Sequence, residues 1–182
     1  MRWMMYMALA ACGGSQTTAR PGPMATSSDH ARPQVAPELA VPDAAKLVLV
    51  ANARGVQIYE CAPDGWKLHA PRADLLDDAG VAIGQHYGGV DRGKPAGPWW
   101  EAKDGSSVHG ANPASVANPG SIPLLRLDGS GATFTGDGGL LSSVAFIQRL
   151  ATTGGVAPAG ACAAGQTSEV PYTATYYFYT KG

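Results

Sequence analysis

The sequence is poor in the features that most directly announce a function. Charged residues make up 15% of the chain, below the roughly 25% of an average soluble domain, which excludes a coiled coil or a charged disordered tail. The formal net charge is −1, so no basic field would attract nucleic acid. No apolar run reaches the roughly 18 residues of a membrane-spanning helix. The motifs G-x-G-x-x-G, G-x-S-x-G and H-E-x-x-H are absent, and we expect no cofactor.

Glycine and proline are abundant instead, at 24 and 14 of the 182 residues. Hydrophobic residues make up 45% of the chain, which is enough for a core. The length corresponds to one domain. This combination predicts a single domain of short elements joined by many turns.

The first residues resemble a bacterial lipoprotein signal. Arg2 precedes an apolar run over residues 3–11, and Leu9 to Cys12 spell Leu-Ala-Ala-Cys, similar to a lipobox. We therefore expect a signal peptide at 1–11, a lipid such as palmitate on Cys12, a flexible tether at 12–41 and a domain at 42–182. An ordinary signal peptide with an accidental cysteine is the alternative.

The expected location is the cell envelope, on the extracytoplasmic side, with the membrane as a partner through the anchor on Cys12. Gly13 follows that cysteine, where the inner-membrane retention signal of enteric lipoproteins has Asp. An outer-membrane address is therefore favoured if the host has two membranes. With Cys12 set aside, Cys61 and Cys162 remain as an even pair in an oxidising compartment, and we expect them to form a disulfide.

Apolar and β-branched runs separated by turn signals fill the chain from residue 46 onward. Predicted strands cover residues 46–50, 56–61, 66–69, 81–87, 99–103, 106–110, 124–127 and 172–179. Predicted turns lie at 52–55, 77–80, 104–105 and 128–129, with a longer loop at 112–123, and Pro71 is expected to stop the third strand. Residues 140–150 fit either a helix or a buried strand, and the surrounding strands favour the strand. The pattern predicts an all-β fold, an antiparallel sandwich or barrel of short strands with long Gly/Pro-rich loops.

The last predicted strand has the clearest alternation. Tyr172, Ala174, Tyr176 and Phe178 share one face, because successive side chains of a strand point to opposite sides. Thr173, Thr175, Tyr177 and Tyr179 share the other face.

Five stretches in order resemble a secreted family of bacteria and fungi, domain of unknown function number 3455. They are Gly55-Val-Gln-Ile-Tyr-Glu-Cys61, Gly84-Gln-His-Tyr-Gly88, Trp100-Glu-Ala-Lys-Asp-Gly-Ser106, residues 148–158 and residues 172–179. The resemblance covers nearly the whole domain. It implies no particular activity, because the family has none established.

The candidate ligand site combines histidine, aromatic and acidic residues on two predicted hairpins. Its members are His86, Tyr87, Trp99, Trp100, Glu101 and His109. With a two-residue turn at 104–105, Trp100 is predicted to pair with His109. Adjoining hairpins would bring His86 and His109 together near Glu101 or Asp104. The alternative is that both histidines are structural residues of a sheet.

Two classes of function stay open at this level. The first is an envelope-anchored, non-enzymatic binding domain for a small molecule, a glycan or an envelope protein. The second is a small extracytoplasmic enzyme or metal-binding protein centred on His86 and His109. Arg149 is a further candidate, either as a ligand for a carboxylate or as half of a structural ion pair.

Overall fold

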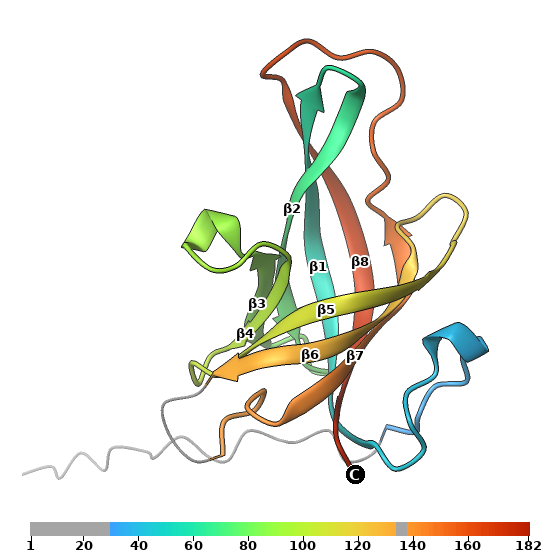
Figure 1. Cartoon of the computed structure of the whole chain (residues 1–182), viewed down its shortest axis with the longest axis vertical. Helices are drawn as coiled ribbons and strands as arrows, with labels where there is room; N and C mark the ends of the chain where they lie inside the picture. Colours follow the sequence, from blue (N-terminus) through green and yellow to red (C-terminus); the bar gives the residue numbers. More distant parts are fainter. Residues whose placement is uncertain (1–29, 134–137) are drawn as a thin grey trace, which may run out of the picture.

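The computed structural model describes residues 30–133 and 138–182, which form a closed antiparallel barrel (Figure 1). Eight strands follow one another around the barrel in chain order, and β8 pairs with β1 to close it. The strands are β1 (Lys46–Ala62), β2 (Gly65–Leu76), β3 (Ala82–Gly88), β4 (Pro98–Ala102), β5 (Ser107–Val116), β6 (Leu124–Thr133), β7 (Val144–Gly154) and β8 (Thr167–Thr180). The all-β prediction is confirmed. Of the two predicted architectures, sandwich and barrel, the chain forms the barrel.

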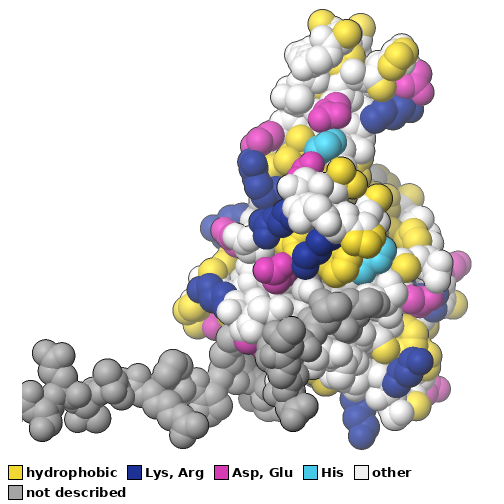
Figure 2. Space-filling view, turned by 60° about the vertical axis from the view of Figure 1, so that its left-hand side comes forward, with side chains coloured by type: hydrophobic (Ala, Val, Ile, Leu, Met, Phe, Trp, Pro, Cys, Tyr) yellow, Lys and Arg dark blue, Asp and Glu magenta, His cyan; other side chains and the backbone are white. Residues whose placement is uncertain are grey.

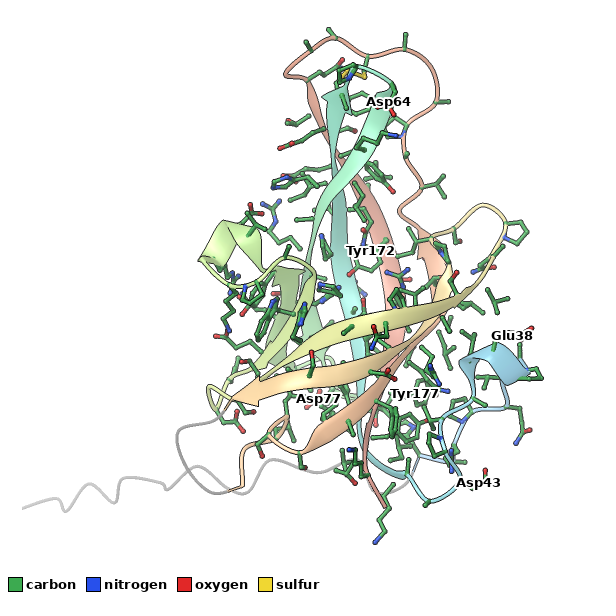
Figure 3. All side chains as sticks on the ribbon, viewed as in Figure 1. Glu38, Asp43, Asp64, Asp77, Tyr172 and Tyr177 are labelled. Carbon is green, nitrogen blue, oxygen red and sulfur yellow. A yellow bond between two sulfur atoms is a disulfide. The ribbon has the colours of Figure 1, made fainter. Side chains whose placement is uncertain are left out.

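The alternation predicted for β8 is confirmed. Tyr172, Ala174, Tyr176 and Phe178 are all at most 4% exposed and belong to the main core cluster. Figure 3 labels Tyr172 and, further along the same strand, Tyr177. Because inward and outward side chains alternate on every strand of a barrel, this face defines the interior. Of residues 140–150, which were predicted as a strand, 144–150 form one within β7, whereas 140–143 form a turn.

The turn predicted at 52–55 does not form, and β1 runs unbroken through it. Gly55 is needed there for close approach: a Cβ would lie 2.1 Å from the Arg72 carbonyl oxygen on β2. The glycine therefore serves contact between neighbouring strands. Pro71 does not stop β2 either, because it lies within the strand opposite Gln57.

The register predicted for the β4–β5 hairpin is wrong by one residue. Trp99 pairs with His109 and Trp100 pairs with Val108. The turn contains an additional residue, since the Ala102 amide donates to the Ser106 carbonyl, and Gly105 has a left-handed φ of 85°. A one-residue slip moves each side chain to the opposite face, so His109 points away from the barrel interior.

Two loop predictions on β5 and β6 are also corrected. The loop expected at 112–123 begins only after Val116, because β5 continues to that residue. The turn expected at 128–129 lies within β6, where Asp128 pairs with Phe146 of β7. Local turn residues are here overridden by long-range pairing. The turn at 77–80 is present, and the Asp77 side chain accepts a hydrogen bond from the Val81 amide at 2.8 Å.

The predicted disulfide between Cys61 and Cys162 is confirmed, with Cα atoms 5.7 Å apart. It lies at the tip of the long β1–β2 hairpin, near Asp64, where the β7–β8 loop passes (Figure 3). The bond therefore joins the protruding hairpin to the segment that leads into β8.

Packing of the chain begins before residue 42, the domain boundary expected from composition. The short helical turn η1 (Pro37–Leu39) lies outside the barrel wall, and Leu39 is 1% exposed. Gln148 donates to the Leu39 carbonyl at 2.7 Å and accepts from the Tyr179 hydroxyl at 2.7 Å. Arg32 donates to three backbone carbonyls in residues 41–43. These bonds fix the approach to β1.

The predicted signal peptide, Cys12 and most of the predicted tether lie outside the described residues. Within the described part of the chain, no helix has the length and hydrophobicity of a membrane-spanning segment.

Candidate functional site

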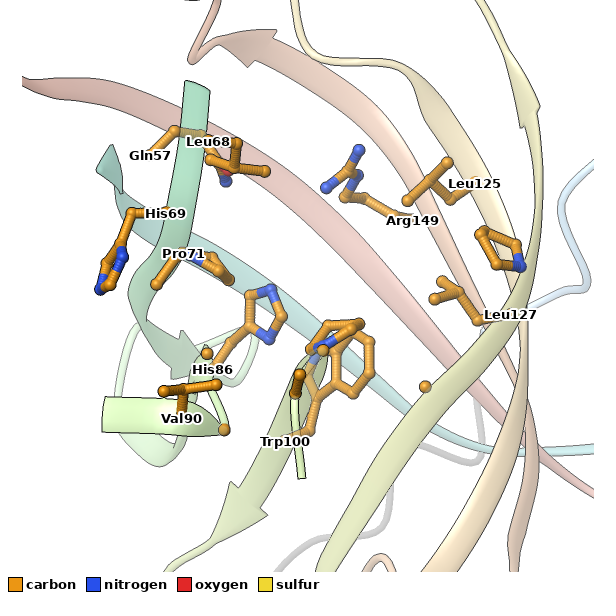
Figure 4. A pocket seen from close by; sticks show the side chains of 18 of the residues that line it. Gln57, Leu68, His69, Pro71, His86, Val90, Trp100, Leu125, Leu127 and Arg149 are labelled. Carbon is orange, nitrogen blue, oxygen red and sulfur yellow. The ribbon is translucent and has the colours of Figure 1, made fainter. Parts of the chain in front are cut away.

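The barrel interior holds a cavity of about 430 Å³ (Figure 4). Each of the eight strands contributes at least one lining residue. Apolar side chains that line it include Pro71, Pro98, Trp100, Pro113, Leu125 and Leu127. The volume falls within the range of about 300–1,000 Å³ typical of small-molecule sites.

Exposed apolar side chains also belong to the lining. Leu68 on β2 is 55% exposed, and Val90 in the helical turn η2 (Val90–Arg92) is 65% exposed. Both are labelled around the cavity in Figure 4. Apolar residues that are exposed at a cavity give an apolar molecule a favourable contact before it is fully enclosed.

His86 and Trp100 form one wall of the cavity. Their rings are stacked with centroids 4.5 Å apart and planes 12° apart, and Tyr176 meets the His86 ring edge-on at 5.2 Å. The His86 Nδ1–H donates to the Trp99 carbonyl at 2.9 Å. Burial lowers the pKa of His86 to about 3, against the opposing effect of that hydrogen bond. The imidazole is therefore neutral at physiological pH, with Nε2 as an acceptor.

Several buried polar atoms lack protein partners. Among the described residues, no hydrogen bond reaches Gln57 Nε2 or Trp100 Nε1. The hydroxyls of Tyr172 and Tyr176 have no partner at full hydrogen-bond geometry, although each interacts with the other and Tyr176 also interacts with Arg149. Gln57, Trp100 and Tyr176 line the cavity, and Tyr172 is on the same inward face of β8. Most buried polar groups in proteins are satisfied. Polar atoms of this kind beside a cavity can bond to water or to a molecule that enters the cavity.

Arg149 brings a permanent positive charge to the cavity. It lies on β7 opposite Tyr176 of β8. Its Nε and Nη2 donate to the Pro123 carbonyl at 3.1 and 2.8 Å. No carboxylate pairs with it anywhere in residues 30–133 or 138–182. Of the two roles considered for Arg149, the structural ion pair is therefore not formed within the described chain.

The carboxylate that lines the cavity is engaged elsewhere. Asp91 in η2 lies 2.9 Å from His69 Nε2, and His69 Nδ1 lies 3.3 Å from Glu60. This contact connects η2 to β2 beside the exposed Leu68 and Val90. Its role is to hold the segment that borders the cavity.

The six predicted site residues separate into two groups. His86 and Trp100 line the cavity, whereas Tyr87, Trp99, Glu101 and His109 lie on the outer side of the barrel wall. His109 stacks on Trp99 at 4.9 Å and donates through Nε2 to the Ala96 carbonyl at 3.0 Å. The two histidines thus face opposite sides of the wall, and the shared site expected from sequence is not formed.

The outer group forms a structural cluster over β3 and β4. The Tyr87 hydroxyl donates to Glu101, and this bond lowers the pKa of Glu101. Lys94 donates to Glu101 at 3.2 Å, and the Arg92 guanidinium lies 3.8 Å from the Tyr87 ring centre. Trp99 is only 6% exposed beneath them. Figure 2 shows basic, acidic and apolar side chains interleaved on the forward face. The groups satisfy one another, so the cluster leaves little capacity for a ligand.

Metal chemistry has no visible basis in the described residues, where no group of three His, Cys, Asp or Glu side chains could hold an ion. Gln57 and Tyr176 are not among the site residues predicted from sequence. The available signal for Tyr176 was the alternation in β8, which groups it with Tyr172, Ala174 and Phe178. Gln57 could be found only once its polar side chain was seen among the inward positions of β1.

The fold and site define a small antiparallel barrel with an internal, mostly apolar cavity. The profile of the family described as "Protein of unknown function (DUF3455)" matches residues 42–180, and the chain belongs to this family. No curated protein matches the chain, and no solved structure matches it.

Proposed function

We propose that this protein is a binding protein that encloses a small, mostly apolar molecule inside its barrel. The observation that carries the proposal is the 430 Å³ cavity whose buried polar atoms lack partners. An unfilled interior forgoes packing contacts, and each unsatisfied buried group costs about 1–3 kcal/mol. A ligand that fills the cavity restores the packing contacts, and a ligand that reaches these polar atoms supplies their missing hydrogen bonds.

The enzyme alternative has less support from the geometry. His86 is stacked on Trp100, bonded to a carbonyl and held neutral. A general base works best with a pKa near the operating pH, and a pKa of about 3 is far below it. His109 is bonded on the outer side of the wall. Binding without chemistry therefore accounts better for the site.

The test uses a neutral apolar fluorophore, N-phenyl-naphthylamine, whose emission rises in apolar surroundings. Wild-type protein is expected to enhance its emission saturably. Leu125→Trp adds volume to the cavity lining and should weaken this binding, while Val81→Trp, at a position 56% exposed, should leave it unchanged. Thermal melts of both variants establish that they fold. Absence of saturable binding by wild type, or equal binding by Leu125→Trp, would contradict the proposal.

The second part of the proposal concerns location. The Leu-Ala-Ala-Cys12 sequence after an apolar run supports lipidation at Cys12 and attachment of the barrel to a membrane of the cell envelope. The Cys61–Cys162 disulfide agrees with an oxidising compartment. Mass spectrometry of protein from its native host should show a diacylglyceryl group on Cys12. A mature protein that begins elsewhere and carries no lipid would refute this part.

A further inference from the structure

We infer that the molecule held in the cavity carries one carboxylate, which Arg149 binds. This inference rests on the proposed function and adds the chemical class of the ligand. It predicts an apolar body with a single anionic group, in preference to a neutral, cationic or multiply charged molecule.

The first support is the unused capacity of Arg149. A guanidinium has five N–H donors, and two of its nitrogens donate to the same Pro123 carbonyl. No acidic side chain within the described residues neutralises it. Figure 4 shows the side chain reaching from β7 into the cavity. An Arg in this position offers a planar, charged fork that matches a carboxylate.

The second support is the positive electrostatic field that Arg149 creates inside the barrel. Burial raises the pKa of both Tyr59 and Tyr176, and the charge of Arg149 partly offsets each rise. Burial and the same charge both disfavour protonation of His86. The Arg149 charge therefore acts on buried groups contributed by three different strands, and an anion would be favoured in this field.

The third support is the chemistry of the unpartnered atoms. Gln57 Nε2 and Trp100 Nε1 are donors only, and the Tyr176 hydroxyl, on the residue opposite Arg149, can donate. An ionised carboxylate is an acceptor only, so it complements this set. Asp91, the acidic residue in the lining, is paired with His69. The remaining lining is largely apolar and suits a hydrocarbon or aromatic body.

The experiment compares ligands of equal chain length by isothermal titration calorimetry. The probes are decanoate, methyl decanoate and decanol, with naphthoate and methyl naphthoate as a more compact pair. Wild type is expected to bind at least one acid about tenfold or more tightly than its ester, because a hydrogen bond to a charged group is roughly twice as strong as one between neutral groups. Arg149→Gln should remove this preference, and Arg149→Lys should keep part of it.

The matched control is Arg54→Gln, which removes the same charge from an exposed position of β1 and should leave the preference intact. Equal binding of acid and ester by wild type, together with saturable binding of the neutral fluorophore, would overturn this inference and leave the proposed function standing. A preference that survives in Arg149→Gln would also overturn it. Failure of every probe, fluorophore included, would overturn both. If Arg149→Gln does not fold, the wild-type comparison of acid with ester decides.

Discussion

Acid should destabilise this protein through one buried side chain, His86. The ring is 1% exposed, stacked on Trp100, and its pKa of about 3 lies far below the ordinary value of about 6.5. In the unfolded chain the ring regains that ordinary value. Between these two pH values the unfolded state binds a proton that the folded state does not, so stability falls as pH falls.

The size of the effect follows from this difference. Stability contributed by His86 is fully present above pH about 6.5 and declines by about 1.4 kcal/mol per pH unit below it. Between pH 6.5 and 4.5 the loss is about 2–3 kcal/mol, a substantial part of a typical total of about 5–15 kcal/mol. The full difference, down to a pH near 3, is about 5 kcal/mol.

The assay is guanidinium unfolding followed by tryptophan fluorescence at several pH values in this range. His86→Asn keeps a donor near the Nδ1 position for the Trp99 carbonyl and removes the titration, so its stability should change less with pH than that of wild type. His109→Asn, on the outer side of the wall, serves as the control and should keep the wild-type slope. Equal slopes in wild type and His86→Asn, or an NMR titration of folded His86 near pH 6.5, would refute the reasoning.

Three further predictions concern stability. Reduction of the Cys61–Cys162 bond, which spans 101 residues, should lower the free energy of unfolding by about 4–5 kcal/mol at most; an unchanged melting temperature in reductant would contradict this. Gln148→Leu leaves two buried partners without a bond, so a loss of about 1–3 kcal/mol is expected in chemical denaturation, along with faster proteolysis of residues 30–45. Gly55→Ala pushes a methyl group into the backbone of β2 and should cost at least about 1–3 kcal/mol; a neutral effect on unfolding would show that the strands can separate there at no cost.

The fold class was accessible from sequence because it depends on local pattern. Alternation in β8 correctly grouped the residues that form its inward face, and counting cysteines identified the disulfide. The errors came where distant contacts overrode local signals. The residues before Gly55, Asn-Ala-Arg, are typical of a turn. Strand β2 nevertheless pairs with this part of β1, so β1 continues through it.

The site was only partly accessible for the same reason. One extra residue in the turn before Ser106 reversed the face of His109, and that turn is secured partly by a bond from the Leu140 amide to Asp104, 36 residues away. His86 and Trp100, two of the predicted site residues, line the cavity, and their role in binding stays a prediction. Three strands, β4 to β6, lie between His86 on β3 and Arg149 on β7, so only closure of the barrel brings both to one cavity.

The long β1–β2 hairpin has a consequence for self-association. Ring closure hides the hydrogen-bonding edges of a sheet, but β3 pairs with β2 only from Arg72 onward. The outer edge of β2 between Gly65 and Pro71 thus has no neighbouring strand among the described residues, and such edges invite pairing with a second chain. Lys67 on this stretch is exposed and charged, and Pro71 removes an amide donor where the free edge ends. This open margin of the barrel therefore carries its own protection against edge-to-edge aggregation.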